Sequence, residues 1–211
     1  IPNDITVYFG LRYAKELGLK TIMTGDGADE LFAGYDYMKD VLNLEEYIQR
    51  LSKRMYFSSN QMADALGLKL RQPYLDRQFL DFAVNKIPVE LKLKKVNGTF
   101  WGKWILRKAF EDALPKEIIW QSKRPLEYGS GMNRLRQVIS DKVFDEEFKG
   151  NTAPISFINK EHFYYYKIYK EVVGEIPKPK INEKECSGCG AGMQKDGFHC
   201  KVCGHVLDWR T

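Results

Sequence analysis

The sequence lacks any long apolar run. No stretch approaches the roughly twenty consecutive apolar residues that a membrane-spanning helix requires, and Ile1-Pro2-Asn3-Asp4 has none of the features of a secretory signal peptide. These absences predict a cytoplasmic protein that has no membrane partner. The chain begins with isoleucine rather than methionine, so we expect it to be a processed or excised piece of something longer.

Histidine and cysteine are also scarce. Two of the three histidines, His199 and His205, lie in the tail, so no Ser-His-Asp or Cys-His catalytic arrangement can be assembled. All four cysteines lie at or beyond Cys186, which excludes a disulfide framework for the main part of the chain. Their clustering points instead to a metal site.

The composition is that of an ordinary globular protein, with 44% apolar and 29% charged residues. Its 211 residues are enough for one sizeable domain and a small appendage. The formal charge of +5 includes lysines that could attract nucleotides or RNA. We favour a solvated basic face, because no stacked aromatic–arginine pattern runs through these clusters. The clustered lysines are Lys86, Lys92, Lys94, Lys95, Lys178 and Lys180.

Residues 24–35, Thr-Gly-Asp-Gly-Ala-Asp-Glu-Leu-Phe-Ala-Gly-Tyr, organise the rest of the sequence. They follow Leu19–Met23, an apolar, β-branched run that predicts a buried strand. The chain then passes through Gly25 and Gly27 into a segment with helical spacing. Such a junction presents free backbone N–H groups and the positive end of a helix dipole, which together favour an anion.

Three carboxylates stand at the same junction: Asp26, Asp29 and Glu30. They would repel a phosphate unless a divalent cation, Mg²⁺ being the best candidate, lies between them. The junction therefore indicates a metal–phosphate site. The alternative is that the glycines only make the turn, Asp26 caps the helix, and the other two acids favour its first turn.

The remaining pattern is mostly helical, so we predict an α/β protein in which helices predominate. The buried parallel strand needs neighbours on both sides, and the sequence pattern reveals none. Asp76 is expected at the start of a helix over Arg77–Asn85, where an N-cap would account for it completely. The aromatic run after His162 is interpreted as core, with His162 in a structural role. Further helices are predicted over Thr6–Leu17, Leu42–Phe57, Gln61–Leu66, Lys103–Phe110 and His162–Tyr169.

The tail contains two Cys-x-x-Cys-Gly knuckles, formed by Cys186, Cys189, Cys200 and Cys203. Two such turns, whose amides donate to the sulfurs, make a tetrahedral thiolate site. Zinc is favoured over rubredoxin-type iron, because nothing else in the chain suggests electron transfer. A closed four-thiolate site is structural rather than catalytic, and about 25 residues cannot hold a core without it. His199 and His205 are expected to be bystanders.

A stiff, polar linker, Ile176-Pro177-Lys178-Pro179-Lys180, precedes this tail. We therefore predict a main domain at 1–176, a linker at 177–184 and a small β-rich zinc ribbon at 185–211.

The stretch from Gly25 to Tyr35 resembles a signature of the synthetase domain of asparagine synthases. Three later stretches resemble the same family in the same order: Arg71–Asp76, Lys103–Phe110 and Gln121–Gly131. The last one resembles a mobile lysine loop. The resemblance covers about residues 1–176, and it implies the later, mostly helical part of an adenine-nucleotide-hydrolase-like (ATP pyrophosphatase) domain.

The resemblance also implies residue roles. Asparagine synthases activate the side-chain carboxylate of aspartate as an adenylate, and ammonia then displaces AMP. Asp26 stands where the family has a glutamate proton acceptor, and Lys123 would stabilise the adenylate as the catalytic cation. Asp29 would bind Mg²⁺–pyrophosphate, and Asp76 would help to hold the substrate. Further candidates for binding substrate or ATP–Mg²⁺ are Gly25, Gly27, Glu30, Gly129 and Gly131. Lys103 and Arg107 are weaker candidates, because pairing with nearby carboxylates explains them equally well.

Two departures from the family stand out. Lys69 replaces a glutamate common in the family, and this reversed charge could alter substrate preference. The ATP loop Ser-Gly-Gly-x-Asp-Ser and the glutaminase domain are both missing from the 211 residues. An upstream segment or a separate subunit would have to supply the ATP loop, and an ammonia source is also needed.

These observations predict part of an ATP-dependent amide ligase that acts on a small carboxylate such as aspartate. One alternative is an amidotransferase-like ligase that acts on a protein or a modified nucleotide. The other is a non-catalytic module that binds RNA or protein and has kept the scaffold. The retained Asp29 and Lys123 argue against this last reading.

Overall fold

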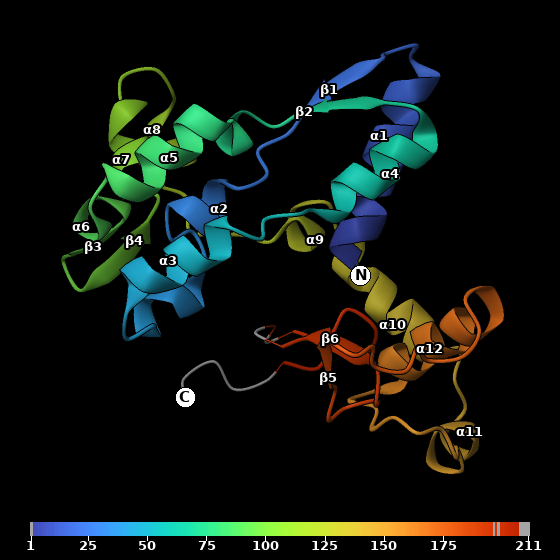
Figure 1. Ribbon diagram of the computed structural model, residues 1–211. Coiled ribbons are helices and arrows are strands. Elements are labelled where there is room, and N and C mark those ends of the chain that lie inside the picture. Colours follow the sequence, from blue (N-terminus) through green and yellow to red (C-terminus); the bar gives the residue numbers. More distant parts are fainter. Residues whose placement is uncertain (1, 196, 198, 207–211) are drawn as a thin grey trace. The chain divides into compact units, whose positions relative to one another are not determined.

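The computed structural model describes residues 2–195, 197 and 199–206 (Figure 1). The chain forms two compact units, which divide between Ser130 and Gly131. These two units are defined by compactness alone. They do not test the domains predicted from the sequence, 1–176, 177–184 and 185–211, which stay a prediction. Among the described residues, no helix has both the length and the apolar character to cross a bilayer.

The first unit is mixed α/β and mostly helical, as predicted. Its elements in chain order are α1 (Pro2–Glu16), β1 (Thr21–Met23), α2 (Ala28–Leu31), η1 (Asp36–Asp40), α3 (Leu44–Ser52), α4 (Ser58–Leu66), β2 (Lys69–Arg71), η2 (Pro73–Leu75), α5 (Arg77–Asn85), α6 (Val89–Lys92), β3 (Leu93–Val96), β4 (Thr99–Gly102), α7 (Trp104–Ala109), α8 (Lys116–Ile119) and α9 (Leu126–Gly129).

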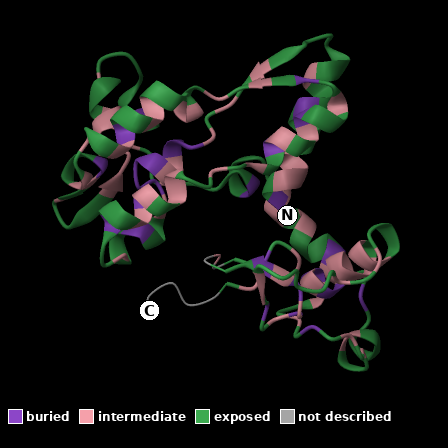
Figure 2. Ribbon diagram, in the orientation of Figure 1, coloured by how far each residue is buried: buried purple, intermediate pink, exposed green. Residues whose placement is uncertain are grey.

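Strand β1 pairs in parallel with β2, in register from Thr21 opposite Lys69 to Met23 opposite Arg71 (Figure 1). Only one face of this two-stranded sheet is covered, because Ile22 and Leu70 pack against a cluster that α1 and α4 share. Neither strand contains a buried residue (Figure 2). The prediction of a buried strand over Leu19–Met23 was therefore wrong in length and in burial, since the described chain gives β1 a single neighbouring strand.

Strands β3 and β4 form an antiparallel hairpin around the turn pair Asn97-Gly98, in register from Leu93 opposite Gly102 to Val96 opposite Thr99. Both turn residues have positive φ, 49° and 82°. Asparagine and glycine tolerate this conformation better than other residues, which explains the tight turn.

Helix α2 lies between two small cores. Leu31 and Phe32 are fully buried and pack with Ala83 of α5. On the other side, Ala33 joins a cluster with Met38 and with Ile48 of α3. These contacts fix the segment that follows the Gly25–Gly27 turn, and so they position its acidic side chains.

Helix ends follow local capping. Helix α5 has the predicted bounds, and the Oδ1 atom of Asp76 accepts hydrogen bonds from the N–H groups of Gln78 (3.0 Å) and Phe79 (3.2 Å). The N-cap role predicted for Asp76 is confirmed. Helix α3 is shorter than the predicted 42–57, because Asn43 caps its N-terminus by accepting from the N–H of Glu46.

The second unit contains η3 (Met132–Arg134), α10 (Leu135–Ser140), α11 (Asp145–Lys149), α12 (Lys160–Val172), β5 (Glu183–Glu185) and β6 (Gly192–Gln194). Asn159 caps α12 through the N–H of His162. The aromatic residues of α12 were predicted to be core, and Phe163 is buried against Phe148 and Phe157, whereas Tyr164, Tyr165 and Tyr166 are half-buried. Strands β5 and β6 are antiparallel.

Candidate functional site

The turn into α2 depends on glycine. Gly27 precedes the helix with φ of 92°, and its N-cap position makes no side-chain capping bond. A Cβ atom there would lie 2.6 Å from Cδ2 of Leu75, so a larger residue would be both strained and crowded. Asp26 is therefore not the helix cap that the alternative interpretation proposed.

Asp26 instead belongs to a hydrogen-bonded network behind the turn. Its Oδ2 atom accepts from the hydroxyls of Thr24 and Ser59, both at 2.7 Å, and from Nε2 of Gln72 at 2.9 Å. Because these donors come from β1's end, from α4 and from the segment after β2, the carboxylate joins three parts of the first unit. One of its two oxygens is already engaged.

Glu30 faces a different partner. The hydroxyl of Tyr35 donates to its Oε1 atom at 2.6 Å. Burial raises the pKa of Tyr35, and the neighbouring Glu30 carboxylate raises it further, so the phenol stays protonated and remains a donor. The three carboxylates that the sequence places together thus face three separate sets of groups, and the geometry does not gather them around one cation.

Asp29 lies between two lysines that are distant in sequence. Lys103 Nζ is 2.8 Å from Oδ1, and Lys123 Nζ is 2.9 Å from Oδ2. Burial alone would raise the pKa of Asp29, but the two ammonium groups outweigh this effect and lower it below its ordinary value. The carboxylate is therefore ionised, and the trio carries a net charge of +1. We call these three residues the lysine clamp.

The backbone around Lys103 brings it to Asp29. Lys103 has a positive φ of 57°, unusual for a non-glycine residue, and its N–H donates to the carbonyl of Phe32 at 2.7 Å. A Cβ atom on Gly34 would meet the Asp29 carboxylate and lie 2.6 Å from Cε of Lys103. On Gly102 it would meet the carbonyl of Ala33. Both glycines are needed for α2 and the β4–α7 junction to approach so closely.

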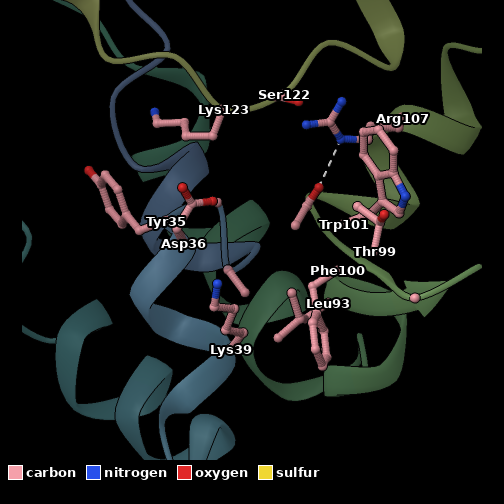
Figure 3. A pocket seen from close by; sticks show the side chains of 14 residues that line it. Tyr35, Asp36, Lys39, Leu93, Thr99, Phe100, Trp101, Arg107, Ser122 and Lys123 are labelled. Carbon is pink, nitrogen blue, oxygen red and sulfur yellow. Dashed lines mark hydrogen bonds between the residues drawn. The ribbon is translucent and has the colours of Figure 1, made fainter.

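A pocket of about 390 Å³ opens beside the clamp (Figure 3). Its wall combines three cations, the carboxylate of Asp36, hydroxyl groups and aromatic rings. Since cations outnumber the one carboxylate, the wall suits an anionic ligand with a flat part. The lining residues that carry such groups are Tyr35, Lys39, Thr99, Phe100, Trp101, Arg107, Ser122 and Lys123.

Arg107 is held rigidly in this wall. Its Nε donates to the carbonyl of Gly102 at 2.9 Å, the bond drawn in Figure 3, and its Nη1 donates to the carbonyls of Ile119 and Gln121. The guanidinium carbon lies 5.2 Å from the ring centroid of Trp101. Burial lowers the pKa of Arg107, although Asp29 opposes this shift. A guanidinium remains charged under such conditions.

The other sequence candidates lie outside the pocket wall. Asp76 caps α5, and Gly129 ends α9 with open space where a Cβ would stand. Gly25 also has open space at its Cβ position, and Gly131 belongs to the second unit. Sequence reasoning missed Tyr35, Lys39 and the aromatic residues of β4. Tyr35 could have been found, because it lies within the signature stretch itself.

The four cysteines gather in the second unit, and all their sulfur atoms lie within 4.8 Å of one another. Among the described residues, no other group of three or more histidine, cysteine or acidic side chains gathers its ligand atoms in this way. The N–H of Gly188 donates to Sγ of Cys186 at 3.3 Å, and the N–H of His205 donates to Sγ of Cys203 at 3.4 Å. The predicted knuckle geometry is confirmed, and a cluster of this kind is consistent with zinc.

Comparison with known proteins accounts for the main part of the chain. A family model for asparagine synthase matches residues 1–58 and 46–175. "Asparagine synthetase [glutamine-hydrolyzing] 2" of Lotus japonicus is 34% identical over 176 residues, which cover 76% of this chain and 30% of the relative. Asparagine synthetase B of Escherichia coli K12 is 30% identical over 198 residues, or 87% of this chain and 34% of the relative. The chain thus spans about a third of the length of these curated relatives. It belongs to the asparagine synthase family.

Proposed function

We propose that this chain forms part of an ATP-dependent amide ligase of the asparagine synthase type. In the reaction, a carboxylate oxygen of the substrate attacks the α-phosphorus of ATP and pyrophosphate leaves. Ammonia or an amine then attacks the acyl carbon, loses a proton, and AMP leaves. The observation that carries the proposal is the lysine clamp of Lys103, Asp29 and Lys123, which opens onto a pocket with a fixed arginine.

The clamp supplies positive charge where the reaction develops negative charge. Asp29 neutralises only one of the two ammonium groups, and Arg107 adds a further cation on the pocket wall. Lys123 also lies 5.1 Å from the ring centroid of Tyr35, so its position is restrained from two sides. A cation held in place before the reaction stabilises the transition state without reorganisation, which is the role we assign to Lys123.

Asp29 also fits the part of a magnesium ligand. Mg²⁺ is commonly held by one or two carboxylates together with substrate phosphates and water. The chain offers Asp29, whose Oδ1 atom is buried and pairs with Lys103 at 2.8 Å, so bound Mg²⁺ would take the place of that ammonium group. Bound Mg²⁺ would supply charge neutralisation on the phosphates. Without the metal, Asp29 orients both Lys103 and Lys123.

Asp26 remains our candidate for the proton acceptor. Because its Oδ2 atom already accepts three hydrogen bonds, a proton from the incoming amine would have to go to Oδ1. The network of Thr24, Ser59 and Gln72 would then act as the support that holds this oxygen in place.

The ligase needs components that these residues do not provide. The printed sequence contains no Ser-Gly-Gly-x-Asp-Ser loop, so an upstream segment or a separate subunit would bind the ATP phosphates. The same assembly would deliver ammonia. We infer that aspartate or a similar small carboxylate is the acceptor. The alternative acceptors are a protein carboxylate and a modified nucleotide.

The test is ATP–pyrophosphate exchange by the assembled enzyme, meaning this chain together with the segment or subunit that carries the ATP loop. Candidate acceptors are supplied in turn, beginning with aspartate. We expect Lys123→Ala to lower the exchange rate about a hundredfold or more, as loss of a positioned charge-stabilising group does. Lys108→Ala is the matched control, because Lys108 pairs with Glu111 outside the pocket wall. Equal exchange by both variants would refute the role of Lys123, and no exchange with any acceptor would refute the ligase.

A specific observation supports RNA binding as the second candidate. The β3–β4 hairpin brings aromatic rings to its lysines: Lys94 Nζ lies 4.9 Å from the ring centroid of Trp104, and Lys95 Nζ lies 5.2 Å from that of Phe100. Phe100 is 45% exposed. Exposed rings beside cations can stack with bases, and the sequence pattern had not revealed this pairing.

Salt-dependent binding of a labelled single-stranded RNA would test this candidate. Phe100→Ala should weaken binding if the ring stacks with a base, whereas Lys86→Ala serves as a control on a basic residue away from the hairpin. Equal binding by the two variants, or no binding at low salt, would exclude the hairpin as an RNA site.

A further inference from the structure

The cysteine cluster shares its core with helix α12. The sequence suggests an independent ribbon behind a linker, but Tyr166 of α12, together with Ile155 and Phe157 from the segment before that helix, packs into the same apolar cluster as the cysteines. Cys186 and Cys200 are among the most fully buried side chains of the described chain. The buried members of this cluster are Ile155, Cys186, Cys189, Ala191, Met193 and Cys200. A single core therefore contains the sulfur atoms and residues that lie before the linker.

Polar contacts join the same parts. The imidazole of His162, in the first turn of α12, lies close to the backbone of Cys203, and its ring centroid lies 5.2 Å from that of Phe157. Within the predicted linker, the carbonyl of Pro177 accepts from the N–H of Gly192 in β6 at 3.2 Å. The linker is thus bonded to the ribbon at Pro177, and the first turn of α12 lies close to the second knuckle.

The spacing of the sulfur atoms fits a metal better than a disulfide. Sγ of Cys186 lies 3.7 Å from Sγ of Cys203, and Sγ of Cys189 lies 3.8 Å from Sγ of Cys200. A disulfide would require about 2.05 Å. A tetrahedron with zinc–sulfur bonds of about 2.3 Å has sulfur–sulfur edges of about 3.8 Å. Two of the six sulfur–sulfur distances therefore match the edges of a zinc tetrathiolate, and the other four are at most 4.8 Å.

The surroundings of the sulfur atoms are also those of a metal site. Two backbone amides donate to sulfur, one in each knuckle, and such donors stabilise thiolate charge. The knuckles are packed against each other: a Cβ on Gly188 would lie 2.8 Å from Cβ of His205, and Ser187 Oγ lies 2.9 Å from Nε2 of the same histidine. No described side chain other than the four cysteines brings a ligand atom into the cluster.

We propose that Cys186, Cys189, Cys200 and Cys203 bind one Zn²⁺, and that the metal stabilises the ribbon and α12 as one cooperative unit. Four thiolates so close together repel one another unless a cation neutralises them. Because Phe157 and Tyr166 pack against the cluster that contains Cys186, Cys189 and Cys200, loss of the metal loosens the core that they share. The zinc therefore stabilises the second unit as a whole and not only the C-terminal ribbon. This inference does not rest on the proposed ligase activity.

The first test measures metal content and local stability of the full chain. Elemental analysis should find one zinc per chain in the wild type and a loss of that zinc in Cys203→Ser. Ser187→Ala is the control, since Ser187 lies within a knuckle but donates no ligand. Hydrogen exchange after chelation should show faster exchange both in residues 183–194 and in α12, with recovery when zinc is restored.

Two results would overturn the proposal. If elemental analysis finds iron in place of zinc, or no stoichiometric metal, the proposed zinc site is wrong. If exchange becomes faster only in the ribbon, and α12 stays as protected as before chelation, then the ribbon and α12 do not form one cooperative unit.

A second variant tests the coupling without touching a ligand. Phe157→Ala removes a ring that packs against the cysteine core, and coupling between two parts of a fold is reciprocal. Zinc affinity, measured by competition with a chromogenic chelator, should fall about tenfold. Phe144→Ala is the control, because Phe144 is 75% exposed. Unchanged affinity in Phe157→Ala would show that the ribbon binds its metal independently of α12.

Discussion

Lys123 Nζ lies 2.9 Å from Asp29 Oδ2, although 94 residues separate the two in the sequence. This ion pair brings the loop before α9 to the first turn of α2, where Lys103 pairs with the other carboxylate oxygen. One carboxylate thus orients two cations at the edge of a pocket.

Replacing Asp29 should destabilise the first unit. In Asp29→Asn the two ammonium groups, whose side chains are only 28% and 27% exposed, lose the charge that holds them together. We expect a loss of about 1–3 kcal/mol in the free energy of unfolding, the usual cost of leaving partly buried polar groups unpaired. Urea denaturation of the full chain measures it. The exposed Asp40→Asn is the control, and equal midpoints for the two variants would contradict the prediction.

The contribution of Asp29 should depend on pH. Burial alone would raise its pKa, but Lys103 and Lys123 hold it below the ordinary value of 3.8. A carboxyl group with a lowered pKa in the folded state stabilises the fold fully above its unfolded pKa, and this stabilisation is lost as the pH falls through the folded pKa. The stability difference between wild type and Asp29→Asn should therefore be constant near neutral pH and shrink below about pH 4. A difference that stays constant down to pH 2 would exclude the ion pairs as its source.

Gly34→Ala should disturb the clamp. The added methyl group would meet the Asp29 carboxylate and lie 2.8 Å from the Cα of Asp29, which the backbone cannot easily relieve. Overpacking of this kind costs about 1–3 kcal/mol, and we also expect slower ATP–pyrophosphate exchange. Gly10→Ala is a matched control, because that glycine lies in α1 with open space at its Cβ position. There alanine should be neutral or stabilising.

Arg107→Lys should not preserve the pocket. The guanidinium donates to three carbonyls and lies over Trp101, and a single ammonium cannot reproduce that planar fork. We expect a higher KM for pyrophosphate in the exchange reaction, with the charge itself unchanged. Lys116→Arg, a conservative change outside the pocket wall, is the comparison. An identical KM for pyrophosphate in wild type and Arg107→Lys would mean that the fork does not hold the anion.

Asp76 allows the capping and substrate-binding interpretations to be separated. Asp76→Asn keeps an oxygen that can cap α5, whereas Asp76→Ala removes it and should cost about 0.5–2 kcal/mol. If the carboxylate also holds substrate, the asparagine variant should retain stability but raise the KM for the acceptor. If both its stability and its KM equal those of the wild type, capping is the whole role of Asp76.

Much of the fold could be predicted from local signals. Helix α5 was predicted with its exact bounds, because Asp76 caps it and its apolar residues repeat with helical spacing. The turn before α2 followed from Gly25 and Gly27, and the two cysteine knuckles followed from their spacing. Strand β2 could not be predicted, because Lys69–Arg71 is too short and too charged to resemble a strand until β1 pairs with it.

The sequence by itself determined the family, the chemistry of the cysteine cluster and the residue types available at the α2 turn. These depend on motif identity and on backbone geometry over a few residues. Only the tertiary structure decided which carboxylate meets which cation: Asp29 pairs with two lysines, Asp26 joins a hydrogen-bonded network, and Glu30 accepts from a tyrosine. It also decided that α12 shares a core with the cysteines. The physical reason is that such contacts form only when distant segments pack together. The local pattern of the chain therefore does not predict which residues will meet.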